Sequence, residues 1–122
     1  MHKIIFALIC CKFLLAGEPP KDSPKVRWKA CDAAHDHIRS ALKAPKTAEF
    51  PNCYRHDELV HTDRLGDQDG GYAVTTYVDA ENSFGVKLRG FYMCAVNMPD
   101  ADHVQTQCLE TDADHKKTLR LF

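Results

Sequence analysis

Two short repeats place carboxylates beside imidazoles. The tetrapeptide Asp-Ala-Asp-His occurs at Asp100–His103 and again at Asp112–His115. Carboxylate and imidazole groups are ligands for zinc and other divalent ions. The candidate metal ligands are therefore the outer residues of each repeat: Asp100, His103, Asp112 and His115. Their spacing matches no standard zinc pattern, and the chain has no HExxH motif. We favour a chance repeat in Asp- and Ala-rich loops.

A thiol and an imidazole also stand one helical turn apart. Cys31 and His35 have the spacing that a nucleophile and its base could take on a helix. Other cysteines are available to pair with Cys31, however, and His35 belongs to the apolar stripe of the predicted helix. We therefore interpret Cys31 as a structural cysteine, and the sequence predicts no catalytic residue and no cofactor.

The element that must organise the chain is a long β-hairpin. Residues 72–79 alternate with period two and are rich in β-branched and aromatic types, as is typical of a strand. Glu81–Gly85 has turn chemistry. The returning strand places Tyr92, Cys94 and Val96 on one face. The opposite face carries Tyr77, Phe91 and Met93, which we predict to form a partner surface.

A helix should cover the inner face of this hairpin. Ser23-Pro24 is a typical helix start, with Ser as the cap and Pro in the first turn. Apolar residues then recur at helical spacing from Trp28 to Leu42. Weaker patterns predict strands at 58–64 and 103–109 and a short one at 118–122. The predicted fold is α+β: one N-terminal amphipathic helix, about 25–43, packs on a meander of three or four antiparallel strands.

The first residues have the layout of a secretory signal peptide. A basic start precedes an apolar run at Ile4–Leu15, and small residues follow at Ala16-Gly17. We predict a signal peptide at 1–17, a linker at 18–24 and one domain at 25–122. The domain is then exported, to a periplasmic or extracellular location. A lipoprotein is disfavoured, because neither Cys10 nor Cys11 follows a small residue.

Four cysteines remain after such a cleavage, and an even number in a small exported domain predicts two disulfides. In a simple meander the start of the first strand, which Cys53 precedes, lies far from Cys94. The helix would end near that start, so its N-terminal half, with Cys31, lies over the same end of the sheet as Cys94. A returning strand would carry Cys108 toward Cys53. The predicted pairs are Cys31–Cys94 and Cys53–Cys108.

Two motifs resemble a known kind of domain. Leu42–Pro51 (LKAPKTAEFP) and Tyr77–Gly85 (YVDAENSFG), followed by Cys94 in the next strand, are similar to an uncharacterised small domain of exported bacterial and prophage proteins. The resemblance covers about 42–96. It implies a bacterial origin and supports the fold, and it implies no activity.

Composition limits the functions further. The chain has 122 residues, which is one domain, with 44% hydrophobic and 27% charged residues, as in an ordinary globular protein. A net charge of -1 gives no general attraction to nucleic acid. We expect a non-enzymatic binding module whose partner is another exported protein. The alternatives are a metal-dependent hydrolase that uses the two repeats, and an inhibitor or immunity-type binder of a secreted enzyme.

Overall fold

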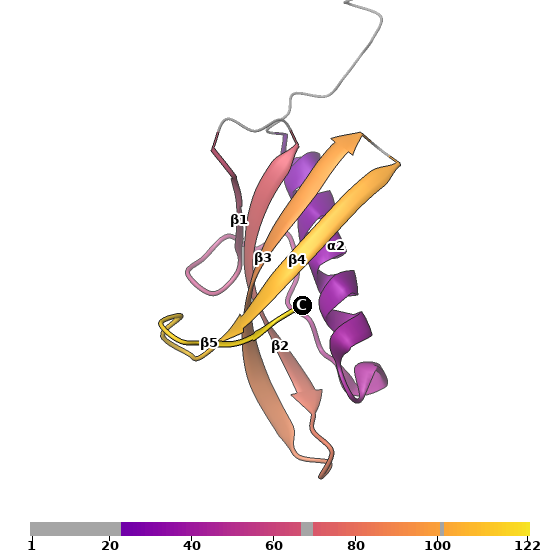
Figure 1. Ribbon diagram of the computed structural model, residues 1–122, viewed down its shortest axis with the longest axis vertical. Helices are drawn as coiled ribbons and strands as arrows, with labels where there is room; N and C mark the ends of the chain where they lie inside the picture. The colour runs from indigo at the N-terminus through magenta and orange to yellow at the C-terminus, as the bar shows by residue number, and fades with distance from the viewer. Residues whose placement is uncertain (1–22, 67–69, 101) are drawn as a thin grey trace, which may run out of the picture.

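The computed structural model describes residues 23–66, 70–100 and 102–122, so the predicted signal peptide and most of the linker lie outside the described residues. Figure 1 shows two layers, with one long helix packed against one sheet. The α+β class and the meander are confirmed. The sheet has five strands rather than three or four, because the short C-terminal segment joins it as an edge strand.

The helix α2 spans Pro24–Ala41. It begins where the sequence predicts: the Ser23 hydroxyl accepts a hydrogen bond from the backbone N–H of Val26 at 3.4 Å. A 3₁₀ turn, η1 (Pro45–Thr47), follows its end. The face of α2 toward the sheet buries Ala30, Cys31, Ala34, His35 and Ile38. Small residues on this face let the helix approach the sheet closely.

The strands are β1 (His61–Arg64), β2 (Gly71–Glu81), β3 (Lys87–Asp100), β4 (His103–Thr111) and β5 (Thr118–Leu121). They pair in chain order and all pairs are antiparallel. The long hairpin is therefore the centre of the sheet, as predicted. The second strand of this hairpin is long: β3 continues to Asp100, and the chain reverses only before His103.

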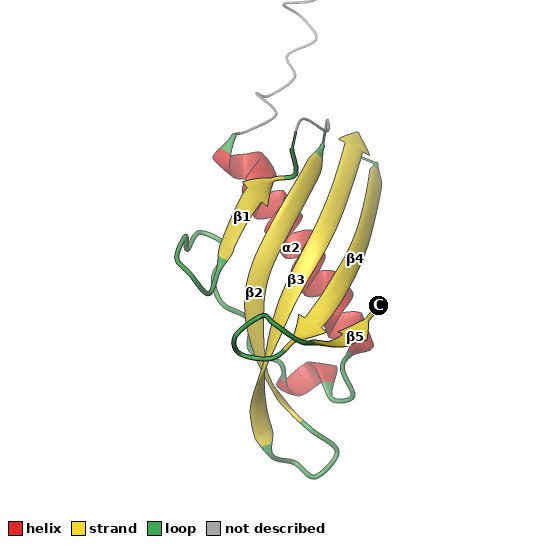
Figure 2. Cartoon of the chain, turned by 60° about the vertical axis from the view of Figure 1, so that its left-hand side comes forward, coloured by secondary structure: helices red, strands yellow, loops and turns green. Residues whose placement is uncertain are grey.

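Register divides the sheet into two faces. One row of paired residues on the helix side runs Val74, Cys94, Cys108, and all three are buried. The next row, one residue along, points to the other side and runs Thr75, Met93, Leu109, Leu121. Figure 2 shows α2 behind the sheet, so the face toward the viewer, called the outer face below, is not covered by the helix.

Both predicted disulfide pairs are wrong. The structure joins Cys94 to Cys108, with Cα atoms 4.0 Å apart, and Cys31 to Cys53, with Cα atoms 5.8 Å apart. Cys94 and Cys108 are opposite each other because β3 and β4 form a tight hairpin. The backbone N–H and C=O of Cys108 bond to Phe122 on the far side, so the two cysteines occupy a non-hydrogen-bonded pair, where side chains approach most closely.

The pairing of Cys31 depends on the connection between α2 and β1. A simple meander would start the first strand near the C-terminal end of the helix. The chain instead runs back along the helix after η1, and Tyr54 packs edge-on against Trp28 with ring centroids 4.3 Å apart. Cys53 is thereby brought beside Cys31, near the N-terminal half of α2.

Candidate functional site

The four predicted metal ligands do not form one site. Asp100 ends β3 and His103 begins β4, and the His103 ring nitrogen Nδ1 is 2.7 Å from a carboxylate oxygen of Asp100. Asp112 and His115 follow the other end of β4. A strand of this length separates its ends by roughly 25 Å at about 3.3 Å per residue, so the two repeats cannot share an ion.

The second repeat builds a turn. The Asp112 carboxylate accepts backbone hydrogen bonds from Lys116 and Lys117, at 2.9 and 3.3 Å. His115 has a left-handed φ of 57° and its ring nitrogen Nδ1 lies 3.0 Å from the hydroxyl of Thr111. These contacts account for Asp112 and His115 as parts of a loop that joins β4 to β5.

That loop folds over one end of the outer face, where it crosses in front of β2 and β3 in Figure 2. The ring of His115 meets Phe91 edge-on, with centroids 5.9 Å apart. Tyr77 is also engaged: the guanidinium of Arg89 lies 4.1 Å from its ring centroid, and Arg55 donates to its hydroxyl at 3.2 Å. Of the three predicted surface residues, Tyr77 and Phe91 are therefore half-covered.

An ion pair holds the side chains in place at the end of the outer face that the loop covers. Arg89 makes two hydrogen bonds to the Asp79 carboxylate, at 2.8 and 2.9 Å. These bonds, more than the charge of Arg89 at a distance, hold the pKa of Asp79 below its ordinary value despite some desolvation. The bidentate geometry keeps the guanidinium in place over Tyr77.

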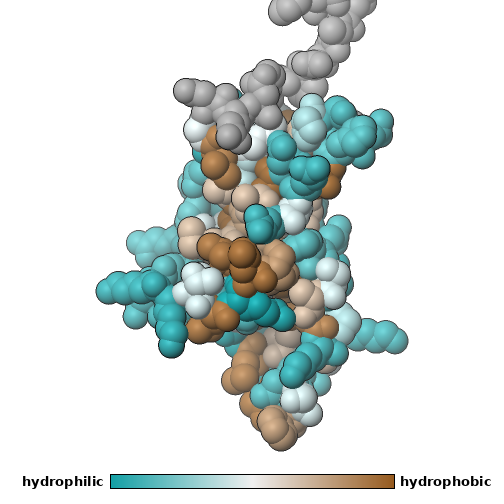
Figure 3. All heavy atoms as spheres, in the orientation of Figure 1, coloured by the Kyte–Doolittle hydropathy of each residue, from teal (hydrophilic) through white to brown (hydrophobic). Residues whose placement is uncertain are grey.

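Met93 lies on a different part of the outer face. Its side chain is 40% exposed, and Leu121 beside it is 59% exposed. A shallow groove of about 300 Å³ lies here, away from the His115 loop. Its apolar lining comes from all five strands or their ends: Leu65, Ala73, Met93, Ala95, Leu109 and Leu121. In Figure 3 apolar side chains gather at mid-height, near the C-terminal segment, with hydrophilic ones around them.

Leu65, Leu109 and Leu121 were missed as surface residues by sequence reasoning. The signal for Leu109 was present, because it directly follows Cys108 in a predicted strand, and neighbouring residues of a strand point to opposite faces. Leu121 could be placed only once the short fifth strand was known to pair with β4 in this register.

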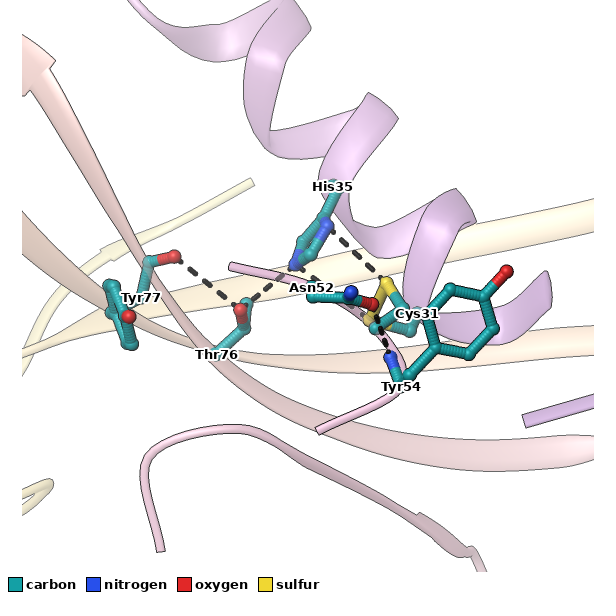
Figure 4. The surroundings of a disulfide bond; sticks show 7 residues. Cys31, His35, Asn52, Tyr54, Thr76 and Tyr77 are labelled. Carbon is teal, nitrogen blue, oxygen red and sulfur yellow. Dashed lines mark hydrogen bonds between the residues drawn. A yellow bond between two sulfur atoms is a disulfide. The ribbon is translucent and has the colours of Figure 1, made fainter. Parts of the chain in front are cut away.

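A second cluster lies on the helix side, around the Cys31–Cys53 disulfide (Figure 4). The ring of His35 lies against both sulfur atoms, with Nε2 3.8 Å from Cys31 Sγ and Nδ1 3.5 Å from Cys53 Sγ. Nε2 is also 2.9 Å from the hydroxyl of Thr76 on β2, and the ring packs against Phe50. Among the residues that the structure describes, Cys31, His35 and Cys53 are the one group with metal-ligand spacing.

Burial determines the protonation state of His35. Its side chain is 6% exposed. Desolvation, with a smaller contribution from the nearby positive charge of Arg39, lowers the pKa of His35 from 6.5 to about 4. The imidazole is therefore neutral at pH 7, in agreement with the interpretation of His35 as a core residue.

No family model, no curated protein and no solved structure matches this chain. The resemblance to an exported bacterial domain therefore gains no support from these comparisons and stays a prediction. In the described ranges 23–66, 70–100 and 102–122, no helix is both long and apolar enough to cross a membrane.

Proposed function

We propose that this chain is an exported, disulfide-braced binding module that docks a partner protein on the outer face of its sheet. The observation that carries the proposal is the row of Met93, Leu109 and Leu121 along a shallow groove on the outer face, in which Met93 and Leu121 are exposed and Leu109 is half-buried. Exposed aliphatic side chains around a groove are typical of a protein-binding surface.

The groove suggests the chemistry of the partner. Its lining is aliphatic and its volume suits one large side chain, so the segment that docks should present a Leu, Met or aromatic residue from a rigid element. Gln107 at the groove can accept or donate a hydrogen bond to the backbone of that segment. An inhibitor or immunity-type protein would use the same surface against a secreted enzyme.

Two disulfides support the exported location, because disulfides persist in oxidising compartments. The layout of residues 1–17 supports it independently. The hydrolase alternative loses its basis, since its residues lie at opposite ends of β4.

The test compares two glutamate variants, each produced in a bacterium, since the resemblance implies a bacterial origin. Met93→Glu places a charge in the groove. Val104→Glu is the matched control, because Val104 is 42% exposed, close to the 40% of Met93, but lies on the other face of the sheet. We expect a partner to co-purify with the wild type and with Val104→Glu and to be lost with Met93→Glu.

Both variants should unfold at nearly the wild-type temperature, because both sites are exposed. A partner that binds Met93→Glu as well as it binds the wild type would place the interaction elsewhere. If sedimentation instead shows a dimer that Met93→Glu converts to a monomer, the groove binds a second copy of this chain and the proposal of a different partner protein is wrong.

A further inference from the structure

The cluster around Cys31 and Cys53 combines three groups that bind metals. Cys31 and His35 are one turn apart on α2, and Cys53 reaches them from the connection that runs back along the helix. Their ligand atoms all lie within 4.8 Å of one another. Two thiolates and one imidazole are a ligand set that zinc prefers.

We propose that, once the Cys31–Cys53 disulfide is reduced, Cys31, Cys53 and His35 form a binding site for Zn²⁺. The disulfide form and the metal form would then exclude each other, so the site would respond to the redox state of its surroundings. The proposal is independent of the outer face, which lies on the opposite side of the sheet.

A hydrogen bond to Thr76 orients the imidazole for this role (Figure 4). The Thr76 hydroxyl donates to the carbonyl oxygen of Tyr77 at 3.4 Å, so its oxygen is left to accept from His35 Nε2–H at 2.9 Å. This geometry fits the tautomer with the proton on Nε2, in which the lone pair of Nδ1 is directed toward Cys53 Sγ, 3.5 Å away. A histidine ligand held from behind in this way is the usual arrangement at zinc sites.

The chemistry balances with a dithiol as the reductant. Its thiolate attacks the sulfur of Cys53, which is less buried than Cys31. The S–S bond breaks, two electrons pass to the cysteines and the dithiol becomes a disulfide, while its two protons end on the Cys31 and Cys53 thiols. Binding of Zn²⁺ then releases these two protons to solvent, and two thiolates and a neutral imidazole hold the ion.

A fourth position is open to water. A groove of about 530 Å³ reaches the cluster from solvent and is lined by Asp32, His35, Asn52 and Cys53 among others. Three protein ligands with one solvent ligand are a common zinc arrangement. The second disulfide, Cys94–Cys108, offers no such site: its cysteines are 3% and 0% exposed, and no histidine ligand lies close enough among the described residues.

The test uses the full chain with Cys10 and Cys11 replaced by serine, so that neither thiol of the leader can bind metal. The second pair is removed by Cys94→Ala and Cys108→Ala. Co²⁺ is added to the protein before and after reduction by dithiothreitol and removal of the reductant. We expect one equivalent of Co²⁺ with thiolate charge-transfer and tetrahedral bands in the reduced protein only, and displacement of Co²⁺ by Zn²⁺.

Variants then distinguish an ordered metal site from non-specific binding of the metal by free thiols. Cys31→Ala with Cys53→Ala should abolish binding. His35→Gln should weaken it at least about tenfold, and Thr76→Val should weaken it about tenfold, while Thr76→Ser restores it, because loss of a partner behind a ligand typically costs 10- to 100-fold.

Folding of the reduced chain is followed separately. We expect Zn²⁺ to raise its melting temperature, because the ion binds the folded site. Three results would overturn the proposal: no metal bound after reduction, equal affinity in His35→Gln, or metal bound without any rise in melting temperature. None of them bears on the partner surface, which is tested with the disulfides intact.

Discussion

The buried His35 should make this protein lose stability in mild acid. In the unfolded chain the imidazole takes up a proton below its ordinary pKa of 6.5, whereas in the folded protein it does so only near pH 4. Between these values the unfolded state binds more protons, and so acid favours unfolding. The contribution of His35 to stability is complete above pH 6.5 and is lost progressively as the pH falls toward 4.

The magnitude follows from the shift. Each unit of pKa corresponds to about 1.4 kcal/mol, so a fall from 6.5 to about 4 removes about 3 kcal/mol from the free energy of unfolding by pH 4. This is a large share of the roughly 5–15 kcal/mol that stabilises a typical domain. The loss should flatten below pH 4, because both states are then protonated.

Urea unfolding of the protein with its disulfides intact, at pH values from 7.5 to 4, would measure this loss of unfolding free energy. The matched variant is His35→Gln, which keeps a side-chain donor for Thr76 but does not titrate. We expect the difference in unfolding free energy between wild type and variant to shrink by about 3 kcal/mol across this range. Other titrating groups are common to both proteins and cancel.

A difference that stays constant with pH would refute the reasoning. The pKa can also be read directly by NMR in the wild type, which keeps the prediction testable if His35→Gln does not fold. A measured value near 6.5 in the folded protein would show that the ring is solvated and that the packing around the disulfide is not as described.

Three further predictions concern the frame of the fold. Peptide mapping without reduction should recover Cys94 linked to Cys108, and replacing both with alanine should cost about 3 kcal/mol, as expected for a separation of 14 residues; a peptide linking Cys94 to any other cysteine would contradict the β3–β4 register. Gly70→Ala should destabilise the protein by at least about 1 kcal/mol more than Gly85→Ala. Both glycines have a φ near 77°, but only at Gly70 would the new Cβ lie 2.3 Å from a backbone oxygen, that of Met98. Equal melting temperatures of the two variants would refute that contact. Phe84→Ser should change the unfolding free energy by less than about 0.5 kcal/mol, since this hairpin-tip ring is 87% exposed, and calorimetry showing a larger loss would mean that the ring is packed.

Local sequence signals were strong enough to predict most elements. Ser23 and Pro24 mark the start of the helix because a side-chain cap and a fixed φ act on adjacent residues. The alternation of residues 72–79 predicts the central strand, because side chains on a strand point to opposite faces in turn. The same rule separates Met93 on the outer face from Cys94 on the buried one.

The disulfide pairing depended on the paths of connections, which no local signal specifies. Cys94 and Cys108 meet because the chain reverses midway between them, and β3 had to extend past Val96 for that to happen. Cys53 meets Cys31 because the segment after η1 runs back along the helix. Both paths are selected by packing of the whole sheet on α2, which acts over long sequence distances.

The sequence by itself thus determined the class of fold, the identity of the central hairpin and which hairpin residues face outward, because these depend on spacing within one element. Only the tertiary structure decided which outward residues are open. The β4–β5 loop covers Phe91, and the Arg89 guanidinium covers Tyr77. The pairing of β5 with β4 adds Leu121 beside Met93. Tertiary structure also separated the two Asp/His repeats and placed His35 against a disulfide, since distances between elements follow from packing and not from position along the chain.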